Sequence, residues 1–369
     1  MRRIVVLLLT AACANDYELV GAPVNVDPED VTECGFTRVD LTAFYRYDCN
    51  PVFTTTGEEW AQSMGSTTFH VTEVAGHPFY QLWYTAYEVT TGDWPPYHVG
   101  YAVSPDGTEF TPNPKNPVMG QPEKSAFDYD YMSGLQVVWD PTEELYVMIY
   151  QGINDDNGGY GMGLATSPDG IRWERSKQNP VYDLHEAVGS VANWCWPLGL
   201  DLGEQGGYTG YIAGSERGND NACEAYRLNA SNLRDWQPSE KKALEAGAEG
   251  EFDDRGFAGL AIAGLGDTRY MFYSGFGHWT AQGKYQVATN LYLGVAEMGK
   301  GKDEWQKWGD YVPVNNTDDG RVSAVAARTV ATRIHLWITD DYDGEQAVGY
   351  FLYDPDRAAE DDAAASGDE

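Results

Sequence analysis

The sequence has few basic residues for its size. Its 369 residues include 24 lysines and arginines against 57 aspartates and glutamates, so the formal net charge is −33 at pH 7. A chain of this charge repels the phosphates of nucleic acids and of anionic membrane surfaces. We therefore exclude nucleic acid as a partner and expect a strongly acidic surface.

Histidine is scarce, and so are long apolar runs. The six histidines show no pair at the spacing of a zinc-binding HxxxH motif, so we expect no metal site and no cofactor, with a calcium ion in a central channel left open. The apolar run Ile4–Leu9 is too short to cross a membrane, and no other stretch is long and apolar enough. These absences exclude a membrane-spanning helix and a zinc enzyme.

The first residues have the pattern of an export signal. Arg2 and Arg3 precede the apolar run, and small residues lead into Cys13. Small residues directly before a cysteine are similar to the lipobox of bacterial lipoproteins, which predicts a signal peptide over residues 1–12 and lipidation of Cys13. The alternative is a plain signal peptide. In either case we expect an exported protein. In the lipidated form, residues 13–35 are a linker and the lipid on Cys13 is the only attachment to the cell envelope membrane.

Four cysteines remain beyond this segment, an even number that suits an oxidising compartment. Of the three connectivities that four cysteines allow, the simplest pairs Cys34 with Cys49 and Cys195 with Cys223. A catalytic thiol at Cys195, assisted by His185, is the alternative, but the sequence around it lacks the motifs of catalytic cysteines. The cysteines therefore predict two disulfides in an exported protein.

A repeated motif organises most of the chain. Residues 99–110 read VGYAVSPDGTEF and residues 162–173 read MGLATSPDGIRW, and Asn-Pro-Val follows each copy. Looser copies occupy residues 223–236 and 291–305. The alternation before Ser-Pro-Asp-Gly predicts a strand, and the proline, aspartate and glycine predict a tight turn into a return strand. Evenly spaced hairpins of this kind indicate one supersecondary unit that is repeated.

The repeats predict five blades. The first full repeat starts at about Asn50, and the last ends near Tyr353 without its turn and outer strand, whereas Phe36–Asp48 has the pattern of a strand without a blade. Pairing the two ends would close a ring and remove the exposed sheet edges. We therefore expect an all-β, five-bladed β-propeller over residues 36–355, with an open β-solenoid as the alternative. The acidic residues 356–369 are expected to be a disordered tail.

The blade motifs, SPDG, NPV and a tyrosine-rich central strand, resemble those of the five-bladed propeller glycoside hydrolases. That group includes arabinanases, β-xylosidases, β-fructosidases and mannoside phosphorylases. The resemblance covers about residues 50–353 and implies a propeller that acts on a glycan or oligosaccharide at a funnel where the innermost strands begin. Hydrolysis there needs one carboxyl group that protonates the leaving oxygen and a second that activates water or attacks carbon.

The resemblance places the candidate site at the starts of the five innermost strands. Asp130 is the candidate base or transition-state stabiliser, and Glu186 or Asp254 is the candidate acid. The arabinanase pattern is incomplete, because residues 63–66 contain no carboxylate and residues 195–197 read Cys-Trp-Pro where Glu-Gly-Pro is usual. The candidate substrate-binding residues are Asp128, Tyr131, Trp194, Trp196, Arg255 and Arg321.

Each kind of candidate has a structural alternative. Asp130 can cap a turn, and Asp128 shares its Phe-Asp pattern with Asp253, which favours a structural role. Arg255 can form a plain ion pair, and Trp196 can belong to the core. The sequence therefore predicts an exported, glycoside hydrolase-like propeller and leaves its activity open. The alternative is a non-catalytic propeller that binds carbohydrate or a surface partner.

Overall fold

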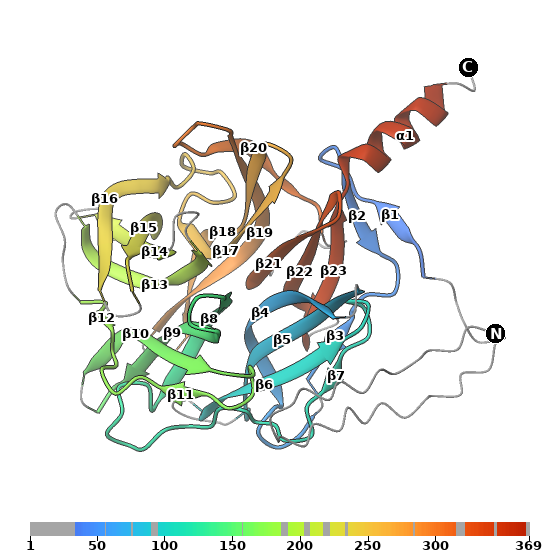
Figure 1. Ribbon diagram of the computed structural model, residues 1–369. Coiled ribbons are helices and arrows are strands. Elements are labelled where there is room, and N and C mark those ends of the chain that lie inside the picture. Colours follow the sequence, from blue (N-terminus) through green and yellow to red (C-terminus); the bar gives the residue numbers. More distant parts are fainter. Residues whose placement is uncertain are drawn as a thin grey trace. The chain divides into compact units, whose positions relative to one another are not determined.

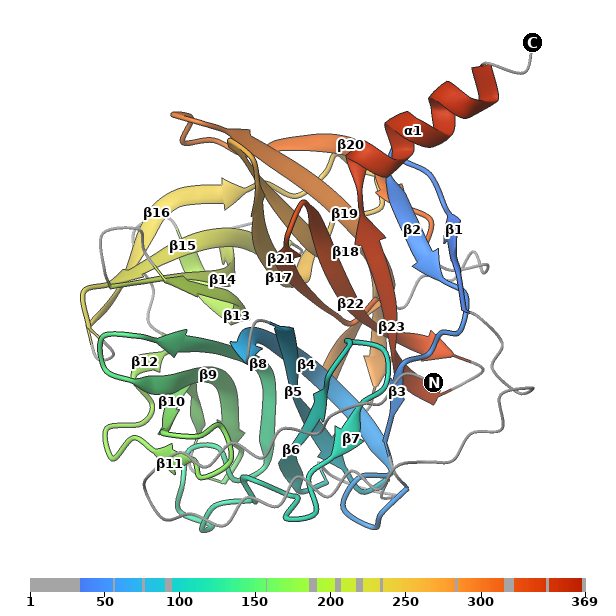
Figure 2. The same ribbon diagram turned by 45° about the vertical axis from the view of Figure 1, so that its right-hand side comes forward.

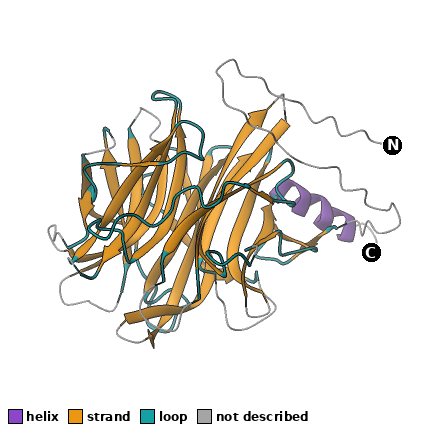
Figure 3. Cartoon of the chain, turned by 90° about the horizontal axis from the view of Figure 1, so that it is seen from below, coloured by secondary structure: helices purple, strands orange, loops and turns teal. Residues whose placement is uncertain are grey.

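The computed structural model describes residues 34–366, with gaps at 56, 75–76, 90–94, 157, 186–190, 203–206, 217–221, 233–234, 283–284, 315–321 and 343–344. Nearly all secondary structure in these residues is β (Figure 3). Residues Gly35–Glu369 belong to one structural unit. No helix in the described part of the chain is long and apolar enough to span a membrane.

The first four blades are antiparallel sheets whose strand order follows the chain. Blade one contains β4 (Ser63–Val74), β5 (His77–Tyr87), β6 (Tyr97–Ser104) and β7 (Thr111–Pro112). Blade two contains β8 (Tyr131–Asp140), β9 (Leu145–Asn154), β10 (Gly159–Ser167) and β11 (Glu174–Arg175), and β12 (Tyr182–Asp183) also pairs with β10. Blade three contains β13 (Val191–Leu202), β14 (Tyr208–Glu216), β15 (Glu224–Ala230) and β16 (Trp236–Leu244). Blade four contains β17 (Gly256–Leu265), β18 (Thr268–Gln282), β19 (Tyr285–Gly299) and β20 (Gln306–Val312).

Blade five is built from both ends of the chain (Figure 1). Its inner strands are β21 (Ala324–Val330), β22 (Arg333–Tyr342) and β23 (Glu345–Tyr353), and its outer strands are β2 (Phe44–Tyr47) and β1 (Phe36–Arg38). β2 pairs with β23 and thereby closes the ring, which confirms the predicted closure. The predicted single strand is in fact a hairpin, because Asp40, Leu41 and Thr42 have positive φ angles and turn the chain between β1 and β2.

The Asn-Pro-Val motif adds a further N-terminal contribution to blade five. The side chain of Asn50 accepts the Tyr350 N–H at 2.7 Å and donates to the Tyr350 carbonyl at 3.1 Å. Asn116 and Asn179 make the same pair of bonds to the third strands of blades one and two. In each case an amide side chain satisfies both backbone groups of a strand residue. Asn50 and the short strand β3 (Phe53–Thr54) therefore belong to blade five, and the prediction that blade one begins at Asn50 was wrong.

The Ser-Pro-Asp-Gly turns join neighbouring blades. Within the first turn, the Ser104 hydroxyl accepts the Gly107 N–H at 2.9 Å, and Gly107 takes a φ of 84° that a residue with a Cβ rarely adopts. The Gly107 carbonyl accepts the indole N–H of Trp337 of blade five at 3.0 Å. The equivalent carbonyl of Gly170 accepts that of Trp83 of blade one at 2.6 Å. Both tryptophans are fully buried, so each turn holds the core residue of the preceding blade.

The innermost strands β4, β8, β13, β17 and β21 each contact the next around a closed ring (Figure 2). The N–H of Leu135 donates to the Ser66 hydroxyl, and the N–H of Val137 donates to the Thr68 hydroxyl. A step of two residues along β8 therefore corresponds to a step of two residues in the same direction along β4. The two strands therefore run parallel, as repeated blades require. We call the end of the axis at which these strands begin the strand-start end, and the other end the strand-terminal end.

The C-terminal residues form the helix α1 (Pro355–Ser366), so the expectation of a disordered tail was wrong for this segment. Asp361 accepts a hydrogen bond from the Tyr45 hydroxyl at 2.7 Å, and Asp362 pairs with Arg38 at 2.6 Å. The segment is rich in alanine, which has the highest helix propensity. Acidic composition alone indicated disorder, but the closing strands provide the partners that order it.

Candidate functional site

Two buried carboxylates near the strand-start end bind other side chains of the protein. Asp128, 2% exposed, accepts hydrogen bonds from the Tyr150 hydroxyl at 3.0 Å and from Arg175 Nε at 2.8 Å. Asp253, 1% exposed, accepts corresponding bonds from the Tyr273 hydroxyl at 3.1 Å and from a lysine, Lys307, at 2.7 Å. The repeated Phe-Asp pattern therefore marks the same buried ion pair in blades two and four, and Asp128 is held in that pair.

Asp130 lies directly before β8, at the strand-start end of blade two. Its Oδ2 accepts the N–H of Asp155, at 2.7 Å, and its own N–H donates to the Ile153 carbonyl at 3.0 Å. Both contacts are with the hairpin that joins β9 to β10. One carboxylate oxygen thus has the turn-capping role that was the structural alternative for this residue.

Asp254 and Arg255 lie directly before β17, at the mouth of blade four. Asp254 Oδ2 accepts the Gly250 N–H at 2.8 Å, and Oδ1 lies 3.6 Å from Arg255 Nε. Oδ1 is buried and has no hydrogen-bond partner. Buried polar atoms are nearly always hydrogen-bonded, so this oxygen is an exception, with the Arg255 guanidinium as its charged neighbour.

Aromatic residues gather at the same end. Tyr131, Tyr97 and Tyr87 form a tyrosine cluster, with ring centroids 4.7 Å apart for Tyr97 and Tyr131 and 4.8 Å apart for Tyr87 and Tyr97. Burial raises the pKa of Tyr131, so its hydroxyl is neutral at physiological pH. Trp196 is half-buried and donates its indole N–H to the Phe257 carbonyl at 3.1 Å. Sequence reasoning missed Tyr87 and Tyr97. Tyr87 is the last residue of β5 and Tyr97 is the first residue of β6, and both strands are rich in tyrosine.

A disulfide joins Cys195 to Cys223, as predicted. It ties β13 to the residue that precedes β15, beside Trp196, and it removes the free thiol that a catalytic Cys195 would need. Cys34 and Cys49 are both disulfide-bonded, as the predicted bridge between them requires. Both pairs agree with an oxidising compartment.

Several predicted residues lie outside the part of the chain that the structure describes. Cys13 precedes the described residues, Glu186 and Arg321 fall in gaps, and the side chain of Trp194 is not described. Within the described residues, no group of three or more histidine, cysteine, aspartate or glutamate side chains is arranged to hold a metal ion. The described part of the site therefore consists of Asp130, Tyr131, Trp196, Asp254 and Arg255.

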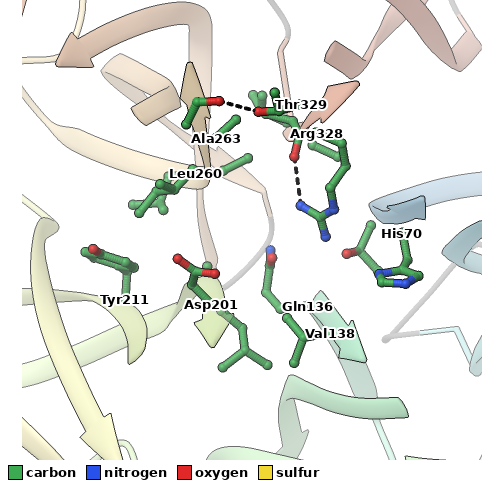
Figure 4. Close-up of a pocket in the computed structure, with 18 of the residues that line it drawn as sticks. His70, Gln136, Val138, Asp201, Tyr211, Leu260, Ala263, Arg328 and Thr329 are labelled. Carbon is green, nitrogen blue, oxygen red and sulfur yellow. Dashed lines mark hydrogen bonds between the residues drawn. The ribbon is translucent and has the colours of Figure 1, made fainter. Parts of the chain in front are cut away.

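A cavity of about 300 Å³ lies on the axis toward the strand-terminal end. The innermost strands of all five blades line it, and we call it the axial cavity. Its walls are mostly apolar, with Leu260 and Val138 among them (Figure 4). Its polar side chains include those of Thr68, His70, Gln136, Asp201, Tyr211, Arg328 and Thr329. Sequence reasoning missed this cavity, and the one signal for it was a lone arginine within the apolar strand Ala324–Val330.

Solved structures of similar fold span nearly the whole chain. A glycosyl hydrolase from Bacteroides ovatus is 16% identical with a TM-score of 0.57, over 87% of this chain and 94% of that one. β-1,2-Mannobiose phosphorylase from Listeria innocua, solved with β-1,2-mannobiose, is 13% identical with a TM-score of 0.58, over 86% and 98%. A third structure comes from work on GH130 glycoside hydrolases that target β-1,2 mannosidic linkages in Candida mannan. It is 16% identical with a TM-score of 0.56, over 90% and 96%.

No protein-family model and no curated protein matches the sequence. At identities this low, the likeness to solved structures establishes the fold and not the activity. The predicted resemblance is confirmed at that level. This chain is a five-bladed β-propeller with the fold of glycoside hydrolases and mannoside phosphorylases.

Proposed function

We propose that the protein is an exported propeller that acts on a glycan or oligosaccharide at the strand-start end. The observation that carries this proposal is the match of the whole ring to glycoside hydrolase and phosphorylase propellers. A fold does not determine an activity, so the side chains at this end must supply the chemistry. The two disulfide pairs support export, and lipidation of Cys13 stays a prediction.

Asp254 and Asp130 are the two carboxylates that we assign to this chemistry. Asp254 is assigned the role of the acid because its Oδ1 accepts no hydrogen bond within the protein and has only the Arg255 guanidinium, 3.6 Å away, as its ion-pair partner. Asp130 acts as the base or transition-state stabiliser through the oxygen that does not cap the β9–β10 hairpin. Glu186 is the alternative acid. Two carboxyl groups with different environments are what glycosyl transfer requires.

The surrounding side chains suit a sugar. Tyr131 and Trp196 offer aromatic faces for the apolar C–H face of a pyranose, and Trp194 is a further candidate. Arg255, 38% exposed, can donate to hydroxyl groups beside Asp254, and Arg321 is proposed for the same role. Asp128 is not part of this proposal, because Arg175 and Tyr150 hold its carboxylate.

Carbohydrate binding without turnover is the second candidate function. It is favoured by the contacts of blade two, where Asp128 is held in a buried ion pair and one oxygen of Asp130 caps a turn. If neither oxygen of Asp130 reaches a substrate, Asp254 alone cannot provide both an acid and a base. The same tyrosines and tryptophan would then bind a glycan that the protein does not cleave.

Neighbouring aspartates provide a matched test. The purified protein is screened against aryl-glycosides, polysaccharides and β-1,2-mannobiose, each with and without phosphate. For an enzyme, Asp254→Asn and Asp130→Asn lower turnover by about a hundredfold and leave the melting temperature nearly unchanged. Asp253→Asn is the control, which lowers stability but leaves the turnover of the folded fraction intact.

The outcomes separate the two candidates. Glycan binding without turnover, weakened by Asp254→Asn, establishes the binding function. Turnover that survives both substitutions shows that other residues carry the chemistry. A protein that neither binds nor cleaves any glycan in the screen contradicts the proposed function.

A further inference from the structure

Arg328 brings a positive charge into the axial cavity without an ion-pair partner. It lies on β21, the innermost strand of blade five, and its Nη1 donates to the Ala327 carbonyl at 2.8 Å. Among the described residues, no carboxylate lies within 4 Å of its guanidinium. Figure 4 shows the guanidinium directed into the cavity, on the wall that it shares with His70.

The other ionisable groups around the cavity offset this charge only in part: burial lowers the pKa of Arg328, and the negative charge of Asp201 opposes that lowering. Asp201 also lines the cavity, but it accepts a hydrogen bond from Arg269 at 2.7 Å, and this pair is neutral as a whole. Burial, followed by the charge of Arg328, lowers the pKa of His70 to about 4, so His70 is neutral at pH 7. Burial likewise keeps the Tyr211 hydroxyl neutral by raising its pKa. The cavity therefore carries one net positive charge in a protein whose formal charge is −33.

The remaining surface of the cavity is suited to a small organic molecule. Leu260, Val138 and Trp139 provide apolar contact surface. The amide of Gln136 and the imidazole of His70 are neutral polar groups that also line the cavity (Figure 4). Ligand sites typically combine apolar walls with a few polar groups that fix orientation. A volume of about 300 Å³ is at the lower end of the range for such sites, enough for one sugar-sized molecule.

We propose that the axial cavity binds a small monocarboxylate, up to the size of a hexuronic acid, through the guanidinium of Arg328. A planar guanidinium binds a carboxylate with two parallel hydrogen bonds. The single positive charge of the cavity matches one carboxylate, whereas a phosphate dianion would bring a second negative charge close to Asp201. This site lies toward the opposite end of the propeller axis from the proposed glycan site and does not depend on it.

Binding is measured by calorimetry on the purified protein with sodium glucuronate, with glucose as the neutral sugar and with sodium phosphate. We expect one glucuronate to bind per chain at least tenfold more tightly than glucose or phosphate. Arg328→Gln removes the charge and is expected to weaken glucuronate binding at least tenfold. Arg328→Lys keeps the charge without the planar guanidinium, and its glucuronate affinity is expected to lie between those of the native chain and Arg328→Gln. Arg172→Gln makes the same change of net charge at an exposed arginine of blade two and should leave binding unchanged.

The melting temperature of the same variants provides an independent readout. A guanidinium that has no carboxylate partner in a largely apolar cavity costs desolvation, so Arg328→Gln should melt at the same temperature as the native chain or higher. A marked loss of stability would make Arg328 a structural residue and overturn the proposal. Glucuronate binding that is absent, that glucose or phosphate equals, or that Arg328→Gln leaves intact would also overturn it. Binding that is abolished by Asp254→Asn but not by Arg328→Gln would place glucuronate at the strand-start end instead.

Discussion

The two ends of the propeller axis use their charged residues in different ways. At the strand-start end, carboxylates occur in close pairs along the chain. The first of each pair, Asp128 or Asp253, is buried against a cation and a tyrosine, and the second, Asp130 or Asp254, has one oxygen bound to a backbone N–H. Toward the strand-terminal end, the cation Arg328 extends from the strand itself and has no carboxylate partner among the described residues.

This difference shows which side chains at each end can be substituted without disturbing the sheets. Asp130 and Asp254 precede their strands, in loops that the buried ion pairs of Asp128 and Asp253 anchor to the blades, so these two carboxylates can change without changing the sheets. The strand-terminal cavity is lined by the innermost strands, so a change there also alters the contacts between blades. Loop residues of a rigid scaffold more often carry function, which is why the proposed reaction is placed at the strand-start end.

The largest effect is expected from opening the ring, which would disrupt both ends together. Deleting residues 14–48 removes β1 and β2, exposes the edge of β23 and removes the partners of α1. The truncated protein should unfold or associate, as size-exclusion chromatography and thermal melting would show. Deleting only residues 14–33, which keeps both strands, is the control. A monomeric 14–48 deletion with an unchanged melting temperature would show that blade five does not need its N-terminal strands.

An intermediate effect is expected from the paired aspartates. Asp253→Asn leaves Lys307, which is 22% exposed, without its charge partner, and should lower the free energy of unfolding by about 2–3 kcal/mol. Asp128→Asn should act in the same way through Arg175, which is 24% exposed. Asp254→Asn and Asp130→Asn should cost far less, because each keeps its backbone hydrogen bond. Urea denaturation measures all four. If Asp130→Asn and Asp254→Asn lowered the free energy of unfolding as much as Asp128→Asn and Asp253→Asn, the division of roles within each pair would be contradicted.

The smallest effect is expected from pH at the axial cavity. The folded pKa of His70 is about 4, below the 6.5 of an exposed histidine, so the unfolded chain binds more protons between these values. Stability due to His70 is therefore complete above pH 6.5 and is lost as the pH falls toward 4. His70→Gln removes this dependence, and its stability relative to the native chain should rise by about 2 kcal/mol between pH 7 and 4.5. Parallel pH profiles for the two proteins would show that His70 titrates normally in the folded state.

Features of the fold that depend on neighbouring residues were predictable from the sequence. The Ser-Pro-Asp-Gly turns and the strands before them are set by local backbone preferences, and their repetition predicts the number of blades. The missing last strand predicts ring closure, because an unpaired edge is unfavourable. The Phe-Asp repeat indicated that Asp128 is structural, and the even number of cysteines predicted the Cys195–Cys223 bridge.

The rest depended on contacts between residues far apart in the chain. Asn50 reads as the start of blade one, but its partner is Tyr350, at the other end of the sequence. The acidic C-terminal segment reads as disordered until the closing strands place Tyr45 and Arg38 against it.

Arg328 is one arginine in an apolar strand, and only the packing of five innermost strands around it makes a charged cavity. Local sequence determines turns and strand periodicity because these involve adjacent residues. Which charges meet, and which are left without partners, is decided only when the ring closes.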